Sequence, residues 1–459
     1  MAFRIRPKGG ATKKKGFIQY KIVGEIRKSQ SVTTYGPGSL IDFPRMSGII
    51  NGIDNWESTL GKYNFEKMVI HERNLEKILG KQFFVQPQLL GDNKNAYGIT
   101  IERFPEYCYC PECGALDKYY KIEKKANNST NYNRDSYCGL CSQSKGRNIK
   151  LIPSRFVTCC KYGHITDFPY EWWVHRKKGR CERPKLNLEI SKKRSGLDGI
   201  TIRCQCGASE NLEGIMDRGS LHQLRCFGEM PWLGKKEDYK GWYSENNTND
   251  PCDEELFVLQ RGANNVYYPV TVSALTIPPY SSRIQKILSA DLTILSNYYG
   301  MNQRLKSENL RNYYENHESK LRCSWEQFNQ ELIYALGLYD SEYRDIQDLL
   351  KAEYNALCDE DCNDPDFLTI ETDVADELAE YFNQIKIIGR LREVQVLKGF
   401  ERISHNDSFV APLSRKPMNW LPGNEMFGEG IFIRFNENKV KEWENRNFNR
   451  YRALIRRSK

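Results

Sequence analysis

Two pairs of cysteines with the spacing of metal ligands lie close together in the chain. Cys110 and Cys113 form the first pair, and Cys138 and Cys141 form the second. Two thiolates separated by two residues can bind one ion from a tight turn, and two such pairs complete a tetrahedral four-thiolate zinc site. The spacing therefore predicts a zinc ribbon, and the alternative is four reduced structural cysteines.

A second set of four cysteines has a less regular spacing. Cys204 and Cys206 are separated by one residue, and Cys226 and Cys252 follow at longer intervals. Four thiols that include one close pair can complete a second all-cysteine zinc site, and this is the grouping that we predict. The alternative is that Cys226 and Cys252 are buried free thiols.

A third set combines two cysteines with two of the six histidines in the chain. Cys160 and His164 lie in one short turn, and His175 and Cys181 follow soon after. Two thiolates and two imidazoles are a known ligand set for structural zinc. We predict a third site from these residues, with Cys159 as an alternative to Cys160 and with core histidines as the other interpretation.

All three predicted sites have four protein ligands and no open position, which describes structural rather than catalytic zinc. Binding of each ion would be coupled to folding, with a free energy on the order of 10 kcal/mol. We therefore expect two to three structural zinc ions that scaffold the middle of the chain.

The sequence contains none of the common motifs of phosphate-binding or hydrolytic enzymes. There is no GxxxxGK[ST] loop, no GxSxG and no HExxH. We therefore expect a protein without catalytic activity of its own. The enzymatic alternative is a metal-dependent nuclease, in which Asp167 beside His164 and His175 binds a metal with an open position.

Basic residues are concentrated in three runs of the chain. Residues 1–30 carry nine lysines and arginines against one acid, residues 176–203 carry ten against three, and residues 434–459 carry nine against three. Such runs favour contact with DNA phosphates without reading of the base sequence, whereas a solvated surface is the alternative. The residues predicted to contact DNA are Lys13, Lys14, Lys15, Arg176, Lys177, Lys178, Arg180, Lys192, Lys193 and Arg194.

Acidic residues dominate another part of the chain. Residues 341–380 carry 14 acidic side chains against two basic ones. We expect helices here that are solvated or that contact a basic partner. A third functional hypothesis follows, in which the protein is a purely structural assembly subunit and this region is its partner interface.

The elements that must position these residues alternate along the chain. The capping-box pattern from Ser324 to Gln327 predicts the start of a helix, and Ser341 is expected to begin a second one. The expected fold class is α+β, multi-domain, with zinc-ribbon-type β modules and a helical insertion. The expected parts are an N-terminal α+β region with a basic arm (1–107), a zinc-binding region (108–255), β-rich core segments (256–280 and 385–435), a helical domain (281–384) and a basic C-terminal helix (436–459).

The composition is that of a soluble globular protein. The chain has 459 residues, of which 39% are hydrophobic and 28% charged, enough for about three domains. An odd total of 15 cysteines cannot be fully paired in disulfides. The first residues lack the apolar segment of a secretory signal, and no apolar stretch is long enough to cross a membrane. We therefore expect a cytoplasmic protein whose cysteines hold metal.

Several segments, taken in order, resemble the DrmB family, a zinc-containing, helicase-associated component of the bacterial DISARM anti-phage system. They are residues 27–30, 34–42, 53–56, 152–156, 163–173, 231–233, 259–265, 273–279, 392–394, 399–400 and 428–432. The resemblance implies a partner, the Swi/Snf-type helicase DrmA, and a DNA-binding complex that restricts phage DNA. Members of the family usually continue past the segment at 428–432 into a further domain, so a truncated or short form is expected.

Overall fold

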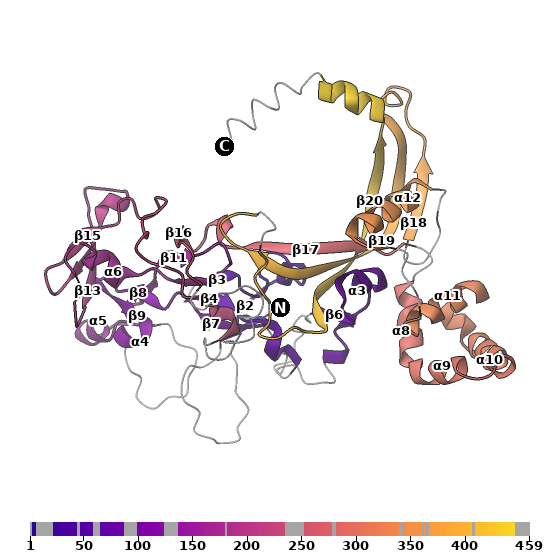
Figure 1. The fold of residues 1–459 in the computed structure, drawn as a ribbon, viewed down its shortest axis with the longest axis horizontal. Coiled ribbons are helices and arrows are strands. Elements are labelled where there is room, and N and C mark those ends of the chain that lie inside the picture. Colours follow the sequence, from indigo (N-terminus) through magenta and orange to yellow (C-terminus); the bar gives the residue numbers. More distant parts are fainter. Residues whose placement is uncertain are drawn as a thin grey trace. The chain divides into compact units, whose positions relative to one another are not determined.

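A computed structural model gives the fold, which divides into two compact units (Figure 1). It describes residues 2–5, 22–43, 46–57, 65–86, 99–123, 136–179, 181–234, 252–277, 281–338, 343–359, 362, 367–405 and 409–445. The first unit comprises Met1–Val69, Val85–Thr271 and Val396–Pro422. The second comprises Ile70–Phe84, Val272–Gln395 and Gly423–Lys459.

The first unit contains a five-stranded sheet with the order β2-β1-β7-β4-β3. Strand β4 lies inside this sheet and is buried along its whole length, and it forms an antiparallel hairpin with β3. Strand β1 pairs with β7 in parallel. The strands are β1 (Ala2–Ile5), β2 (Ile22–Glu25), β3 (Leu40–Phe43), β4 (Met46–Ile50) and β7 (Ile99–Arg103).

Two further sheets of the first unit carry the cysteines. The six-stranded sheet has the order β10-β8-β9-β13-β14-β15, and the three-stranded sheet has the order β12-β11-β16. The strands are β8 (Tyr107–Tyr109), β9 (Ala115–Lys118), β10 (Ile152–Pro153), β11 (Phe156–Cys159), β12 (Ile165–Asp167), β13 (Leu186–Ile190), β14 (Ile200–Cys204), β15 (Ser209–Asn211) and β16 (Phe257–Gln260). The short helices are α4 (Tyr119–Ile122), α5 (Gly139–Ser144) and α6 (Tyr170–His175).

A cluster of aromatic side chains forms the core between these sheets. Phe156, Phe168 and Trp173 are almost fully buried. The Phe168 ring lies 4.8 Å from that of Tyr170 and 5.7 Å from that of Trp173, in edge-to-face arrangements that aromatic pairs prefer. The Trp173 indole N–H donates to the carbonyl of Asn211 at 2.9 Å, which attaches α6 to β15.

A further sheet, most of whose residues belong to the second unit, has the order β17-β19-β20-β6-β5, and β18 also pairs with β19. The strands predicted within residues 256–280 and 385–435 are present as β16, β17, β19 and β20. The strands of this sheet are β5 (Val69–Ile70), β6 (Phe83–Val85), β17 (Tyr268–Leu275), β18 (Phe367–Thr372), β19 (Phe382–Glu401) and β20 (Trp420–Phe435).

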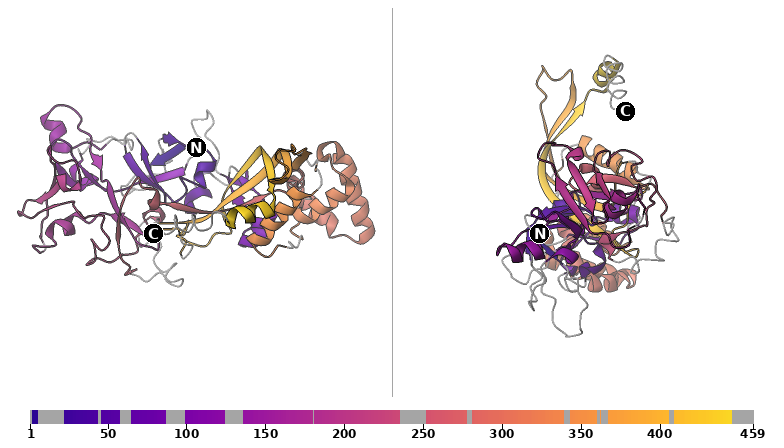
Figure 2. Two further views of the ribbon diagram at one scale, coloured as in Figure 1. Left: turned by 90° about the horizontal axis from the view of Figure 1, so that it is seen from above. Right: turned by 90° about the vertical axis from the view of Figure 1, so that its left-hand side faces the viewer.

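Helices make up most of the rest of the second unit, and α8 to α11 pack together as a bundle (Figure 2). The Ser324 hydroxyl accepts from the backbone N–H of Gln327, so α11 begins at the predicted cap. The predicted helix start at Ser341 lies outside the described residues, and α12 begins where Asp345 caps it. The helices are α3 (Arg73–Leu79), α8 (Ser282–Ala290), α9 (Leu292–Tyr299), α10 (Gln303–Leu321), α11 (Trp325–Ala335) and α12 (Ile346–Cys358).

The fold is mixed α+β with several sheets, as the sequence predicted. The basic C-terminal helix is described over 437–445, and the rest of that prediction lies outside the described residues. The five-part division of the chain stays a prediction. Among the described helices, none combines the length and apolar composition that crossing a bilayer requires.

Candidate metal centres

The four cysteines of the two Cys-x-x-Cys pairs meet beside the β8–β9 hairpin, and we call them cluster 1. Cys110 and Cys113 lie in the turn between β8 and β9, while Cys138 and Cys141 lie at the start of α5. The sulfurs of Cys110 and Cys141 are 3.8 Å apart, as are those of Cys113 and Cys138. The structure therefore brings together the four residues that their spacing grouped.

These sulfur separations suit one tetrahedral ion. With Zn–S bonds of about 2.3 Å, a regular tetrahedron places its sulfurs about 3.8 Å apart. A disulfide would require about 2.05 Å, and all 15 cysteines are free thiols here. Cluster 1 thus has the donor set and the spacing to hold a metal ion.

Gly114 closes the turn that carries Cys110 and Cys113. Its φ is +73°, and its N–H donates to the Cys110 carbonyl at 2.8 Å. A Cβ here would lie 2.3 Å from Oδ1 of Asn187, whose side-chain amide donates to the Cys113 carbonyl. Burial opposes ionisation of Cys110, but hydrogen bonds from the backbone N–H groups of Cys113 and Glu112, together with those from the Cys113 and Cys138 thiols, lower the pKa of this thiol.

Cluster 2 consists of Cys160, His164, Cys226 and Cys252, all of them buried. Cys160 and His164 lie in the turn between β11 and β12. The Nδ1 atom of His164 is 3.3 Å from the sulfur of Cys160 and 3.6 Å from that of Cys226. The sulfurs of Cys160 and Cys252 are 4.0 Å apart. Hydrogen bonds from the Cys160 and Cys226 thiols lower the pKa of Cys252.

Cluster 3 consists of His175, Cys181, Cys204 and Cys206. The Nε2 atom of His175 lies 3.3 Å from the sulfur of Cys206. Its other ring nitrogen, Nδ1, lies 2.6 Å from the Glu171 carbonyl and donates to it. This bond fixes the tautomer that leaves the Nε2 lone pair available for a metal, as in many zinc sites.

The predicted grouping of the second and third sets is wrong, because the two sets exchange pairs. Cys204 and Cys206 lie with His175 and Cys181, and Cys226 and Cys252 lie with Cys160 and His164. Each cluster therefore offers three thiolates and one imidazole. The reason is tertiary: α6 packs on β14 and β15 and carries His175 to the end of β14.

Backbone pairing explains why Cys226 and Cys252 reach the β11–β12 turn. The Cys226 N–H donates to the Glu254 carbonyl at 3.0 Å, and the Asp253 N–H donates back to the Cys226 carbonyl at 3.1 Å. The N–H of Ile165 donates to the Glu229 carbonyl at 3.1 Å. These bonds join residues far apart in sequence, so spacing alone could not reveal the grouping.

Two nearby cysteines stay outside the clusters. Cys159, the alternative to Cys160, is buried at the end of β11, and burial raises its pKa to about 12. Burial likewise raises the pKa of Cys108 to about 12, and its thiol faces the Asp117 carbonyl at 3.7 Å. Neither sulfur is among the ligand atoms that gather in the three clusters.

The three residues of the predicted nuclease site, His164, Asp167 and His175, do not form one metal site in this structure. His164 belongs to cluster 2 and His175 to cluster 3. The Asp167 carboxylate accepts from the backbone N–H groups of Tyr107 at 3.0 Å and Glu106 at 3.2 Å. Burial raises the pKa of Asp167 to about 6.

Sequence reasoning missed Arg402, which supports the turn of cluster 2. Its side chain is 1% exposed and donates to the carbonyls of Gly163, Gly38 and Val266. The guanidinium also lies 4.7 Å from the Phe400 ring centre. Three chain segments are thereby tied to one side chain, and nothing in the sequence around Arg402 signals this role.

Comparison with known proteins shows which family contains this chain. Residues 27–268 match the model of a family described as a domain of unknown function, DUF8724. The chain belongs to the DUF8724 family. All twelve cluster residues lie within the DUF8724 match.

The chain is also similar to the DISARM protein DrmB of Bacillus paralicheniformis (strain ATCC 9945a / NCIMB 11709 / CD-2). The two are 29% identical over 404 residues, which cover 83% of this chain and 66% of the relative. The chain thus spans just under two thirds of the relative's length. The resemblance to DrmB seen in the sequence motifs is confirmed.

Three of the residues predicted to contact DNA already form ion pairs or other contacts with residues of the protein itself. Arg176 stacks over the Trp173 ring at 3.3 Å and lies 3.7 Å from Glu210. Lys177 forms an ion pair with the same Glu210 at 2.8 Å, and Lys178 donates to the Gly207 carbonyl. The basic charge on this side of cluster 3 is therefore partly neutralised.

Of the other residues predicted to contact DNA, the structure describes only three. Lys192 and Lys193 are exposed in the turn between β13 and β14, and Arg194 lies 3.8 Å from Asp198. Lys13, Lys14, Lys15 and Arg180 lie outside the described residues. Contact of any of these residues with DNA stays a prediction.

Proposed function

We propose that the chain is a non-catalytic, zinc-stabilised subunit of an anti-phage defence complex, and that it associates with a DrmA-like Swi/Snf-type helicase and helps to bind DNA. The single observation that carries the scaffold role is the presence of three clusters with four protein ligands each. Four protein ligands fill a tetrahedral zinc site and leave no position for a substrate.

Similarity to a DISARM protein supports the defence role. The matched segment runs through most of this chain and includes all three clusters. The resemblance to DrmB implies a helicase partner, and we expect this chain to have one as well.

Exposed lysines support the DNA-binding part of the proposal. Lys192 and Lys193 lie side by side in sequence on the turn after β13, with Lys177 and Lys178 after α6. Lysines in this setting contact phosphates as point charges and do not read bases. Binding should therefore weaken as counterions compete at higher salt.

A salt titration of DNA binding tests this proposal. We expect the complex of the chain and its helicase to bind DNA with an affinity that falls steeply with salt. Replacement of Lys192 and Lys193 by glutamate should lower the affinity about tenfold at low salt and reduce the slope of log K against log salt by about two.

The matched control reverses two exposed lysines of the second unit, Lys320 and Lys351. It changes the net charge of the protein equally and should leave DNA affinity within about twofold. Equal losses in both double variants, or an affinity that does not respond to salt, would contradict a specific basic surface. Failure of the chain to co-purify with the helicase would contradict the assembly.

A further inference from the structure

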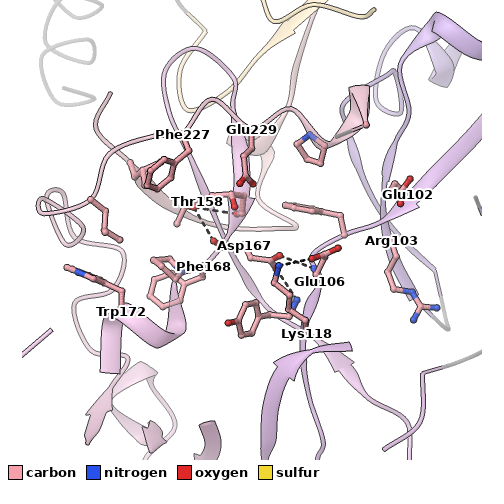
Figure 3. Close-up of a pocket in the computed structure, with 18 residues that line it drawn as sticks. Glu102, Arg103, Glu106, Lys118, Thr158, Asp167, Phe168, Trp172, Phe227 and Glu229 are labelled. Atoms are coloured by element: carbon pink, nitrogen blue, oxygen red, sulfur yellow. Dashed lines mark hydrogen bonds and ion pairs between the residues drawn. The ribbon is translucent and has the colours of Figure 1, made fainter. Parts of the chain in front are cut away.

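A cavity of 560 Å³ lies within the first unit, among β7, β8, β11, β12 and α6 (Figure 3). Its size falls within the range of small-molecule sites. No ligand atom of the three clusters lines it, but residues close in sequence to clusters 2 and 3 do. None of the twelve cluster residues or the predicted DNA contacts lines it, whereas Asp167 of the nuclease alternative does.

Aromatic rings form one side of this cavity. Phe227, Phe168 and Trp172 lie on the same side of Asp167 (Figure 3). Phe227 is 61% exposed although it is large and apolar. It directly follows Cys226 of cluster 2, and Trp172 lies one turn before His175 of cluster 3. The two clusters therefore fix the ends of the segments that present these rings.

Carboxylates predominate over cations in the rest of the lining. Two of the charged groups neutralise each other, because Lys118 and Glu106 form an ion pair at 3.0 Å. The Glu229 side chain is exposed, and no described residue pairs with its carboxylate. The acidic lining residues are Glu102, Glu106, Asp167 and Glu229, and the basic ones are Arg103 and Lys118.

We infer that this cavity binds an organic cation, either the guanidinium of an arginine side chain from a partner protein or a free polyamine. A cation is attracted to the faces of aromatic rings and forms charge-assisted hydrogen bonds with carboxylates. Phe227 and Trp172 supply the rings, and Glu229 supplies a carboxylate. A nucleotide fits less well, because the net negative lining would repel its phosphate.

Calorimetric titration of the zinc-loaded full chain at low salt tests this inference. The probes are the peptide acetyl-Gly-Arg-Gly-amide, its citrulline counterpart, spermidine and deoxyguanosine. Citrulline keeps the shape of arginine but lacks the charge. We expect the arginine peptide or spermidine to bind, and the one that binds more tightly identifies the source of the cation. The citrulline peptide should bind at least about fivefold more weakly than the arginine peptide.

Substitutions of residues that line the cavity provide a second test. Glu229→Gln and Phe227→Leu should each weaken cation binding about three- to fivefold, since each removes one attractive group. Glu213→Gln is the matched control, because Glu213 is an exposed glutamate of the same unit outside the cavity lining. It should leave binding unchanged.

Three results would overturn the inference. They are equal binding of the citrulline and arginine peptides, binding of deoxyguanosine in preference to both cations, and no cation binding by protein that retains its zinc. None of these depends on DNA binding or on the helicase. The inference and the proposed function can therefore fail separately.

Discussion

Single residues decide which atoms of each cluster can face a metal ion. The hydrogen bond from His175 to the Glu171 carbonyl orients one imidazole, and the Gly228 N–H donates to the sulfur of Cys226 at 3.3 Å. Bonds of this kind stabilise thiolates and fix ring orientation before an ion binds. The sequence predicted the cluster residues by type, but these supporting contacts come from backbone groups that no spacing pattern reveals.

Gly114 offers a test of the backbone requirement at cluster 1. Gly114→Ala would place a Cβ in a left-handed conformation and only 2.3 Å from Asn187 Oδ1. We expect it to destabilise the zinc-bound protein by more than about 2 kcal/mol, from conformational strain and the clash together. The measurement is the rate at which a chromogenic chelator removes zinc.

The matched control is Gly207→Ala in the turn of cluster 3. Gly207 has a φ of +90°, but nothing lies within 4 Å of its Cβ position. It should cost only about 1–2 kcal/mol of conformational strain. If both variants release zinc at the same rate, the close packing of Gly114 against Asn187 has no role.

Contacts between helices and strands determine which residues meet in one cluster and where charged side chains are buried. The β11–β12 hairpin and the contact of α6 with β14 and β15 bring together residues that spacing assigned to different sites. In the second unit, Glu353 of α12 is 5% exposed and accepts from the N–H of Leu275 in β17 at 2.8 Å. A helix was predicted in this acidic part of the chain, but its attachment through a buried carboxylate was not.

Burial raises the pKa of Glu353 to about 7, above its ordinary value of 4.5. Because the folded pKa is the higher one, the folded state takes up the proton first as pH falls, and this group destabilises the fold most above pH 7. Glu353→Gln keeps an acceptor for Leu275 without the charge. It should stabilise the protein by about 1–3 kcal/mol at pH 8, with the gain shrinking as pH falls toward 4.5.

Urea unfolding of variant and wild type, followed by circular dichroism, measures this difference. Glu326→Gln on the surface of α11 is the control and should show no such pH dependence. A gain for Glu353→Gln that is the same at pH 8 and pH 5 would show that Glu353 is not buried as a charge.

For the whole molecule, zinc binding by the three clusters would account for ten of the 15 cysteines and would lower the net charge. Ten thiolates and three divalent ions would lower the formal net charge from +9 to about +5. The composition and the motifs were enough to predict an α+β fold, the likeness to DrmB and the twelve residues that gather in the three clusters. They could not predict which ligands share an ion or where the cavity lies, because both depend on contacts between segments that are distant in sequence.

The zinc content of a double variant shows directly which residues share an ion. We expect three zinc ions per chain for the wild type after dialysis against a competing chelator. His175→Ala combined with Cys206→Ala should keep two ions, because the structure places both residues in cluster 3. The grouping predicted from spacing assigns them to different sites and requires that only one ion remain. A double variant with one ion would contradict this grouping of the ligands, and a wild-type protein with almost none would contradict zinc binding by the clusters.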